Sequence, residues 1–173
     1  FLSKLPTMKS DFIDLVDFDK DSYSINKKYV VISPFKSAQW EMGKMADLEY
    51  RNLAETIVEK FGYKVIFVGD GSEFDSIGQI ISKSRHPKMI TNMAGKTDFV
   101  ELVSILKDAK FIVANDNGVS HLSSFLGFKT LVLFMFSDPK VYAWPNKNYA
   151  YIFNDIHPCM ACVGINPYPQ DNY

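Results

Sequence analysis

From Tyr29 onward the chain alternates short apolar runs with longer stretches in which apolar residues recur every three or four positions. Short β-branched runs are typical of buried strands, and the period of 3.6 is typical of amphipathic helices. Strands that alternate with helices favour a mostly parallel sheet with crossover helices on its faces. The sequence therefore predicts an α/β domain with a doubly wound sheet, whose ligand site lies beyond the carboxyl ends of the strands.

Six runs are candidates for the strands. Four are strongly apolar, and Met89-Ile90 and Tyr149–Phe153 are less marked. The four are Tyr29–Ser33, Lys64–Val68, Lys110–Ala114 and Thr130–Phe134. Their number and the intervening helices make the predicted domain Rossmann-like.

Two of the predicted helices carry clear terminal signals. The first spans residues 46–61 and ends at Gly62, which supplies a left-handed stop. The second begins at Thr97 or Asp98, and Glu101 completes a capping box with Asp98. The faces predicted to be buried are Tyr50, Leu53, Ala54, Ile57, Val58 and Phe61 in the first helix, and Phe99, Leu102, Val103 and Leu106 in the second. A weaker helical pattern covers Glu73–Lys83, and a short one ends at Gly127.

Charge and length exclude several classes of protein. Nineteen Lys and Arg residues against twenty Asp and Glu residues give a formal net charge of −1, which argues against a nucleic-acid binder. No apolar run approaches the ~20 residues that span a bilayer. The 173 residues, 47% of them hydrophobic, suffice for one domain with a substantial core. We place that domain at residues 29–173 and interpret residues 1–28 as a linker or entry segment.

The ends of the chain carry two further indications. The sequence begins with Phe1, and residues 1–28 lack the layout of a signal peptide, so we expect a piece of a longer protein. Cys159 and Cys162 are the only cysteines, which excludes a framework of several disulfides and fits a reducing compartment.

The most informative segment runs from Phe111 to His121. An apolar strand leads through the turn Asn115-Asp116-Asn117-Gly118 into a helix, whose first backbone N–H groups favour an anion such as a phosphate. His121 lies in the first helical turn, so its ring can reach the same anion or be held by Asp116 in one tautomer. The competing interpretation is purely structural: Asp116 or Asn117 caps the helix, and His121 packs against the sheet.

Several motifs, in order, resemble those of the family-9 glycosyltransferases, which include the lipopolysaccharide heptosyltransferases. Asp116-Asn117-Gly118-Val119-Ser120-His121 is similar to the family's Asp-Thr-Gly-x-x-His signature. Met93-Ala94-Gly95-Lys96-Thr97 and Phe134-Met135-Phe136-Ser137-Asp138-Pro139 resemble two further stretches, and Cys159-Met160-Ala161-Cys162 a third. The resemblance covers about residues 29–165. It implies one lobe of a two-lobed GT-B type enzyme, namely the carboxyl-terminal lobe, which binds a nucleotide-activated sugar.

The resemblance also assigns candidate substrate-binding residues. Glu73, which ends the Gly-rich turn after the second strand, is expected to hold the ribose hydroxyls, or else is a solvated acid at a helix start. Met93 either lines the base pocket or fills the core. The loop 34–45 corresponds to a phosphate-contacting loop, with Ser37 and Lys44 as candidates and Lys36 as a substitute for Lys44. Ordinary surface lysines are the competing interpretation. Asn117 replaces the usual Thr, yet its backbone N–H and that of Gly118 are unchanged.

The implied reaction is an inverting, metal-independent transfer of a glycosyl group, with ADP-heptose as the donor and lipopolysaccharide core as the acceptor. His121, Lys44 and the helix start at Gly118 would stabilise the leaving diphosphate. No cofactor is implied, because the nucleotide sugar is a substrate. The general base comes from the amino-terminal lobe in the family, so this chain alone is expected to bind the donor without turning it over. The resemblance implies a cytoplasmic protein, with any membrane contact at the inner face of the inner membrane belonging to the other lobe and the lipid acceptor.

A zinc site or a redox pair at Cys159 and Cys162, with His157 nearby, is the competing interpretation of the remaining histidines and cysteines. Cys159, Cys162 and His157 lack the fourth ligand of a structural zinc site, and the cysteines do not open a helix as redox pairs do. We interpret the cysteines as a structural or inert pair. His86, which precedes Pro87 in a polar loop, is interpreted as solvated.

Two other functions are compatible with the same residues. One is a Rossmann-type module that holds a nucleotide without catalysis. The other is a two-lobed sugar-nucleotide epimerase, which relies on acidic and histidine residues in both lobes. The segment Asp116–His121 alone does not separate these functions from glycosyl transfer.

Overall fold

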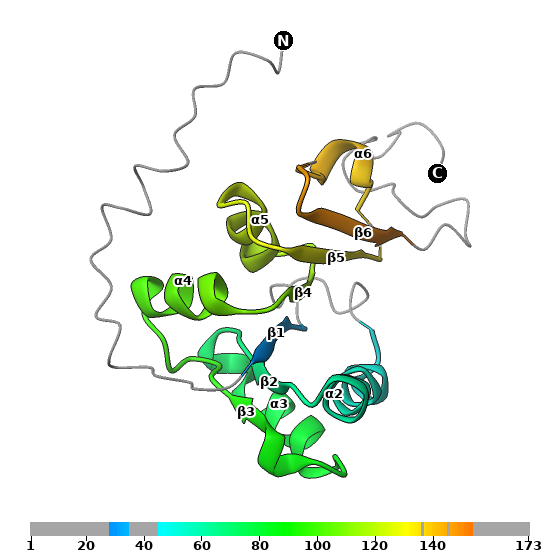
Figure 1. Cartoon of the computed structure of the whole chain (residues 1–173), viewed down its shortest axis with the longest axis vertical. Coiled ribbons are helices and arrows are strands. Elements are labelled where there is room, and N and C mark those ends of the chain that lie inside the picture. Colours follow the sequence, from blue (N-terminus) through cyan, green and yellow to red (C-terminus); the bar gives the residue numbers. More distant parts are fainter. Residues whose placement is uncertain (1–27, 35–44, 136, 145, 154–173) are drawn as a thin grey trace, which may run out of the picture.

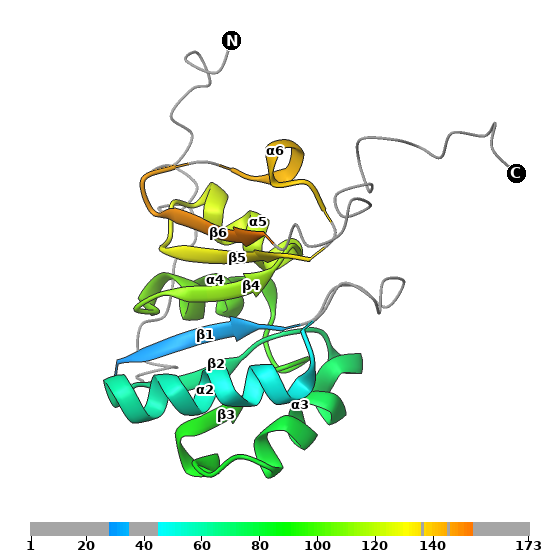
Figure 2. The same cartoon turned by 90° about the vertical axis from the view of Figure 1, so that its right-hand side faces the viewer.

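A computed structural model of the chain describes residues 28–34, 45–135, 137–144 and 146–153. In this part of the chain, six strands form one sheet in the order β3-β2-β1-β4-β5-β6, and each neighbouring pair is parallel. Figure 2 shows the arrowheads pointing the same way. The strands are β1 (Tyr29–Ser33), β2 (Lys64–Phe67), β3 (Ile90–Asn92), β4 (Ile112–Asn115), β5 (Thr130–Phe134) and β6 (Tyr149–Phe153). The predicted doubly wound parallel sheet is confirmed.

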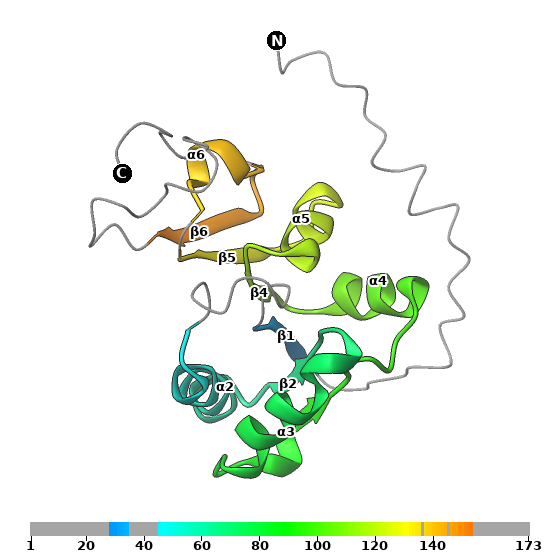
Figure 3. The same ribbon diagram turned by 180° about the vertical axis from the view of Figure 1, so that it is seen from behind.

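Helices cover both faces of the sheet. α2 (Asp47–Phe61) and α3 (Phe74–Ser82) pack on one face, and α4 (Phe99–Asp108) and α5 (Gly118–Phe125) pack on the other. Figures 1 and 3 show the two pairs on opposite sides of the strands. Short 3-10 turns, η3 (Gly71–Glu73) and η4 (Pro87–Met89), precede α3 and β3, and a single turn, α6 (Pro139–Tyr142), precedes β6.

The first strand, β1, is apolar from Tyr29 to Ile32 because both of its faces are covered. Val30 and Ile32 belong to the core cluster that includes α2 and α3, whereas Tyr29 and Val31 belong to the cluster beneath α4 and α5. Successive side chains of a strand point to opposite faces, so a strand covered on both sides needs apolar residues at every position. The apolar run therefore marks a central strand of the sheet.

Two local signals in the sequence are confirmed. Gly62 ends α2 with φ of 64°, and its N–H donates to the carbonyl of Val58. At the start of α4, the Asp98 N–H donates to Glu101 Oε2 at 2.9 Å, and the Glu101 N–H donates to Asp98 Oδ1 at 2.8 Å. Both signals act within a few residues, so distant contacts are not needed to establish them.

The predicted burial of apolar side chains is wrong for two residues at helix ends. Phe61 and Phe99 carry the apolar period of their helices but are 58% and 54% exposed. Phe61 is the last residue of α2 and stacks on Tyr63, and Phe99 is the first residue of α4. Periodicity gives the direction in which a side chain points around a helix, but not how far along the helix the sheet extends.

Some strand limits also differ from the prediction. The fourth strand was expected at Lys110–Ala114 but spans Ile112–Asn115, because Asn115 still pairs with Leu133 of β5 while the ladder begins only at Ile112. The third strand spans Ile90–Asn92 rather than Met89-Ile90. The turn α6 was not predicted, although Asp138 caps it by accepting from the Lys140 N–H at 2.8 Å.

No helix in the described ranges is long and apolar enough to cross a membrane. The predicted division between a linker at residues 1–28 and a domain at 29–173 stays a prediction, because residues 1–27 lie outside the described part.

A buried carboxylate joins α2 to the segment between α3 and β3. Glu55 is only 4% exposed, and it accepts the Arg85 backbone N–H at 2.8 Å, Nε at 2.9 Å and Nη2 at 2.7 Å. These hydrogen bonds, first from the backbone and then from the guanidinium, lower the pKa of Glu55 to about 2. Glu59 also reaches Arg85, at 3.0 Å, but its side chain is 41% exposed.

We expect Glu55→Gln to lower the free energy of unfolding by about 2 kcal/mol at pH 7, because it removes hydrogen bonds to a charged group. The folded pKa lies below the ordinary value of 4.5, so the contribution is present above pH 4.5 and lost as the pH falls toward 2. Urea unfolding at several pH values should therefore show the gap between wild type and variant closing in that window. The matched control is Glu59→Gln, whose exposed ion pair should matter little; equal losses in the two variants would contradict the prediction.

Candidate functional site

The connections that follow β1, β2, β3 and β4 all leave from the carboxyl edge of the sheet. The central strands β1 and β4 are neighbours, and the chain leaves β1 toward α2 on one face and β4 toward α5 on the other. Such a point, where the winding of the sheet reverses, opens a crevice that binds ligands in α/β proteins. The turn that the sequence singled out, after β4, lies at this point (Figure 2).

A capping box shapes the start of α5. The Ser120 N–H donates to Asn117 Oδ1 at 3.1 Å, and the Asn117 N–H donates to Ser120 Oγ at 3.0 Å. The His121 N–H donates to the carbonyl of Asn117 at 3.1 Å. Among the contacts recorded for the described residues, the N–H groups of Gly118 and Val119 have no partner. They are the groups at a helix start that can bind an anion.

Asp116 holds the ring of His121. The distance from His121 Nε2 to Asp116 Oδ1 is 3.2 Å, and the Asp116 side chain is 9% exposed against 41% for His121. Of the two arrangements that the sequence left open, the structure therefore has the ring engaged by Asp116. With Nε2 beside the carboxylate, Nδ1 is the ring nitrogen left for a ligand, and it donates to an anion when the imidazole carries both protons.

Asn117, not Asp116, is the helix cap. The structural interpretation of this turn was thus correct about the cap, but it did not foresee the pair of Asp116 and His121. Capping by an asparagine side chain and anion binding by the following backbone N–H groups use different atoms, so both can occur in the same turn.

Glu73 lies at the corresponding position after β2. Its Oε2 accepts the backbone N–H of Asp70 at 3.2 Å, and the carboxylate lies against Gly69, where a Cβ would collide with it. Burial, and then the charge of Asp70, raise the pKa of Glu73 to about 7. Glu73 and Asp70 form a capping box, so the side chain does lie at a helix start, as the competing interpretation expected, but it is partly buried rather than fully solvated. Near pH 7 it exchanges a proton.

The turn after β2 packs closely against the turn after β3, and the residues at the contact are Gly71 and Gly95. Gly95 has φ of 66°, and a Cβ built on it would lie 2.5 Å from the Cα of Gly71. The Gly95 N–H donates to the carbonyl of Gly69 at 3.0 Å. Met93, between β3 and this turn, is partly buried against the cluster beneath α4 and α5, so it contributes to the core and still lies at the carboxyl edge of the sheet.

Other predicted residues fall in two groups. Lys36, Ser37 and Lys44 lie outside the described residues, as do His157, Cys159 and Cys162. His86 is described and is partly solvated, with 35% of its side chain exposed, and its Nε2 also lies 2.9 Å from Glu59 Oε1 at the surface. Glu59 is 27 residues away in the sequence, so no local pattern indicated this contact.

Sequence reasoning missed the polar side chains that tie the crevice together. Tyr50 was expected only as part of an apolar face and Asn115 only as part of a turn. In the structure the Tyr50 hydroxyl lies 2.8 Å from Asn115 Oδ1, and both side chains contact the carbonyl of Pro34. The only signal available was a tyrosine, rather than a wholly apolar residue, in a buried stripe.

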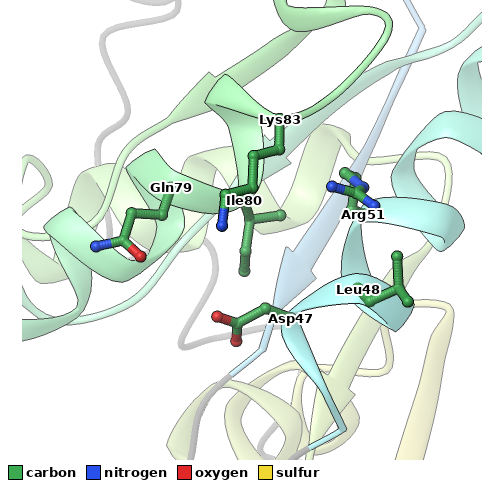
Figure 4. Close-up of a pocket in the computed structure, with 6 residues that line it drawn as sticks. All are labelled: Asp47, Leu48, Arg51, Gln79, Ile80 and Lys83. Carbon is green, nitrogen blue, oxygen red and sulfur yellow. The ribbon is translucent and has the colours of Figure 1, made fainter.

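A hollow of about 120 Å³ lies elsewhere, between α2 and α3 (Figure 4). It is lined by Asp47, Leu48, Arg51, Gln79, Ile80 and Lys83. Of the predicted site residues that the structure describes, none lines it. Across the ranges that the structure covers, no three His, Cys, Asp or Glu side chains are grouped so that they could share a metal ion.

Comparison with known proteins extends these observations. A family model described as glycosyltransferase family 9 (heptosyltransferase) matches residues 6–169. Lipopolysaccharide heptosyltransferase 2 of Salmonella typhimurium is 27% identical over 92 residues, which are 52% of this chain and 26% of that protein.

Solved structures show the same fold. E. coli ADP-heptose lps heptosyltransferase II matches with a TM-score of 0.66 and 23% identity, covering 76% of this chain and 40% of that one. The E. coli heptosyltransferase WaaC with ADP matches with a TM-score of 0.65 and 17% identity, covering 80% and 40%. The chain thus spans well under half the length of these relatives and has the fold of one lobe of a GT-B type enzyme. Because the family model covers nearly all of its residues, the chain belongs to glycosyltransferase family 9, the heptosyltransferase family.

Proposed function

We propose that this chain is the carboxyl-terminal, donor-binding lobe of a heptosyltransferase that transfers heptose from ADP-heptose to lipopolysaccharide core. The family supports the class of reaction, and the relative solved with ADP supports the nucleotide. The observation that carries the proposal is the start of α5. Backbone N–H groups of Gly118 and Val119 lie beside the Asp116–His121 pair, at the point where the sheet reverses its winding. We call this arrangement, residues 116–121, the diphosphate seat.

The seat suits the charge that develops during transfer. An acceptor oxygen forms a bond to the anomeric carbon while the bond from that carbon to the diphosphate breaks, and ADP leaves with the electron pair. The proton of the acceptor hydroxyl goes to a base that we place in the amino-terminal lobe. Helix N–H groups and the His121 ring, with Lys44 from the loop after β1, stabilise the leaving diphosphate more strongly as its charge grows. In this proposal protein groups rather than a metal ion meet the charge, and the lobe alone binds the donor without turning it over.

Glu73 is proposed to hold the ribose, with Ser37 or Lys36 and Asn117 assisting at the phosphates and Met93 beside the base. A carboxylate accepts two hydrogen bonds from a vicinal diol, but only its ionised form does so. Since Oε2 already accepts the Asp70 N–H, Oε1 is the oxygen available for a hydroxyl.

The raised pKa of Glu73 predicts that ADP affinity increases with pH. The diol favours the ionised carboxylate, so binding should release a proton and tighten as the pH rises through about 7. Without ligand, the raised pKa of Glu73 also affects the free energy of unfolding. Its stabilising contribution is fully present below pH 4.5 and is lost as the pH rises to about 7. The measurement is calorimetric titration of ADP between pH 6 and 8.

The control for this titration is Glu73→Gln. A terminal phosphate of ADP also ionises near pH 6, and this dependence remains in the variant. The difference between the two pH profiles therefore reports Glu73 alone. Parallel profiles in the two proteins would contradict a carboxylate at the ribose.

The experiment that tests the proposed function is titration of the chain with ADP, UDP, ADP-heptose and UDP-glucose. We expect saturable binding of ADP and ADP-heptose, tighter for the sugar-bearing ligand, and much weaker binding of the uridine compounds. Binding of ADP and ADP-heptose with equal affinity would favour a non-catalytic nucleotide module. The absence of saturable nucleotide binding would refute the donor lobe.

A further inference from the structure

A buried hydrogen-bonded cluster joins three segments at the reversal point of the sheet. The Tyr50 hydroxyl, on α2, lies 2.6 Å from the carbonyl oxygen of Pro34 and 2.8 Å from Asn115 Oδ1. Asn115 Nδ2 donates to the same Pro34 carbonyl at 2.7 Å. Tyr50 is fully buried and Asn115 is 1% exposed. The end of β1, the first turns of α2 and the end of β4 are therefore held in one arrangement.

A second contact ties the same turn to β1 two residues later. Asn117 Nδ2 donates to Ser33 Oγ at 3.0 Å. Asn115 and Asn117 flank Asp116, and each reaches the end of β1, one through Pro34 and the other through Ser33. The backbone that presents the N–H groups of the diphosphate seat is thus attached on both sides of Asp116.

The Tyr50 hydroxyl is suited to a permanent structural contact. Burial raises its pKa well above the ordinary value of a tyrosine, so the group remains a neutral donor at any pH of interest. It has a single proton for two carbonyl-type oxygens, which both lie within hydrogen-bond distance. Loss of the hydroxyl would therefore loosen the contacts of Pro34 and Asn115 together.

We propose that Tyr50, acting through Asn115, is a positioning residue that sets the diphosphate seat against the end of β1. This inference rests on the proposed function, because the seat is the anion site assigned there. Tyr50 does not contact the ligand. Its contribution is geometric: it holds the turn after β4 in the position from which the N–H groups of Gly118 and Val119 meet a diphosphate. A displacement on the order of 1 Å at such a site has large effects on affinity.

The chain offers a matched control. Tyr29, at the start of β1, is also buried, and its hydroxyl also donates to a backbone carbonyl, that of Ile105, at 2.8 Å. This contact is at the opposite end of β1, against the end of α4. Tyr29→Phe and Tyr50→Phe therefore remove the same chemical group from comparable surroundings, but only the second lies next to the seat.

The test measures dissociation constants of inorganic pyrophosphate, ADP and adenosine for the whole chain, together with stability toward urea. We expect Tyr50→Phe to weaken pyrophosphate and ADP binding about tenfold and to leave adenosine binding within about twofold of wild type. Tyr29→Phe should lower stability with all three affinities unchanged. Asn115→Ala, a second variant, should lose anion affinity as Tyr50→Phe does, and the double variant should be no worse than Asn115→Ala alone.

The outcomes separate this inference from the proposed function. Unchanged pyrophosphate affinity in Tyr50→Phe, or equal loss in Tyr50→Phe and Tyr29→Phe, overturns the positioning role while leaving the donor lobe intact. Pyrophosphate binding without ADP binding by wild type overturns the proposed nucleotide, and the variants then test the seat with pyrophosphate. Binding of neither ligand by wild type overturns both.

Discussion

Asp116→Ala is expected to weaken ADP binding about thirtyfold, as much as loss of the His121 ring itself. Asp116 is buried and holds the His121 ring at 3.2 Å, so its loss frees the ring beside the diphosphate. Removing a carboxylate also removes a negative charge near the anion, which acts in the opposite direction. We expect the loss of orientation to dominate, because a precisely held donor contributes more than the same donor on a mobile side chain.

Two variants separate orientation from charge at this position. Asp116→Asn removes the charge but keeps an oxygen beside His121 Nε2, so its affinity should stay within about threefold of wild type. His121→Ala removes the ring itself and should weaken ADP binding at least as much as Asp116→Ala does, about thirtyfold. The measurement is calorimetric titration of each protein.

The control for this series is Asp138→Ala. Asp138 is 7% exposed and caps α6, so it is a buried aspartate like Asp116, but it lies in another turn. Its replacement should lower stability and leave the ADP affinity unchanged. Tighter ADP binding by Asp116→Ala would show that charge repulsion, not ring orientation, governs this position, and would contradict the assigned role of the pair.

Gly95→Ala is expected to lower the free energy of unfolding by about 3 kcal/mol. A left-handed backbone costs a residue with a side chain about 1 kcal/mol, and overpacking against the backbone adds about 2 kcal/mol. The collision is with Gly71, whose Cα would lie 2.5 Å from the new Cβ and whose nitrogen would lie 3.0 Å from it. Backbone atoms cannot rotate away as a flexible side chain can.

Gly62→Ala measures the cost of the left-handed backbone conformation without the steric collision. Gly62 has nearly the same φ, 64° against 66°, but a Cβ there meets no atom within 4 Å. Its replacement should therefore cost only about 1 kcal/mol. Urea denaturation of both variants gives the comparison, and similar losses at the two positions would show that the turns after β2 and β3 can move apart without penalty.

The sequence predicted most of the fold because the deciding interactions are local or periodic. The capping box of Asp98 and Glu101 spans three residues, and the left-handed stop at Gly62 depends on one. The alternation of strands with amphipathic helices left few arrangements other than a doubly wound sheet. The turn after β4 was recognisable for the same reason: an apolar strand, a capping residue and a helix follow one another directly.

The candidate site was predictable only in part. Order along the chain placed Glu73, Met93 and Asp116 after successive strands, and the parallel sheet then brought all three to one edge. Sequence could not indicate that Glu73 is half-buried beside Asp70 and titrates near pH 7, because that depends on how tightly the turn closes.

By itself, then, the sequence determined the class of fold, the parallel sheet, the helix boundaries that rest on caps, and the turn that can bind an anion. Tertiary structure alone decided that the ring of His121 meets Asp116, that Tyr50 and Asn115 share the carbonyl of Pro34, and that Phe61 and Phe99 remain exposed. The physical reason is range. Caps and periods act within a turn or two of the chain, whereas burial and the geometry of a hydrogen bond depend on which distant segments are packed together.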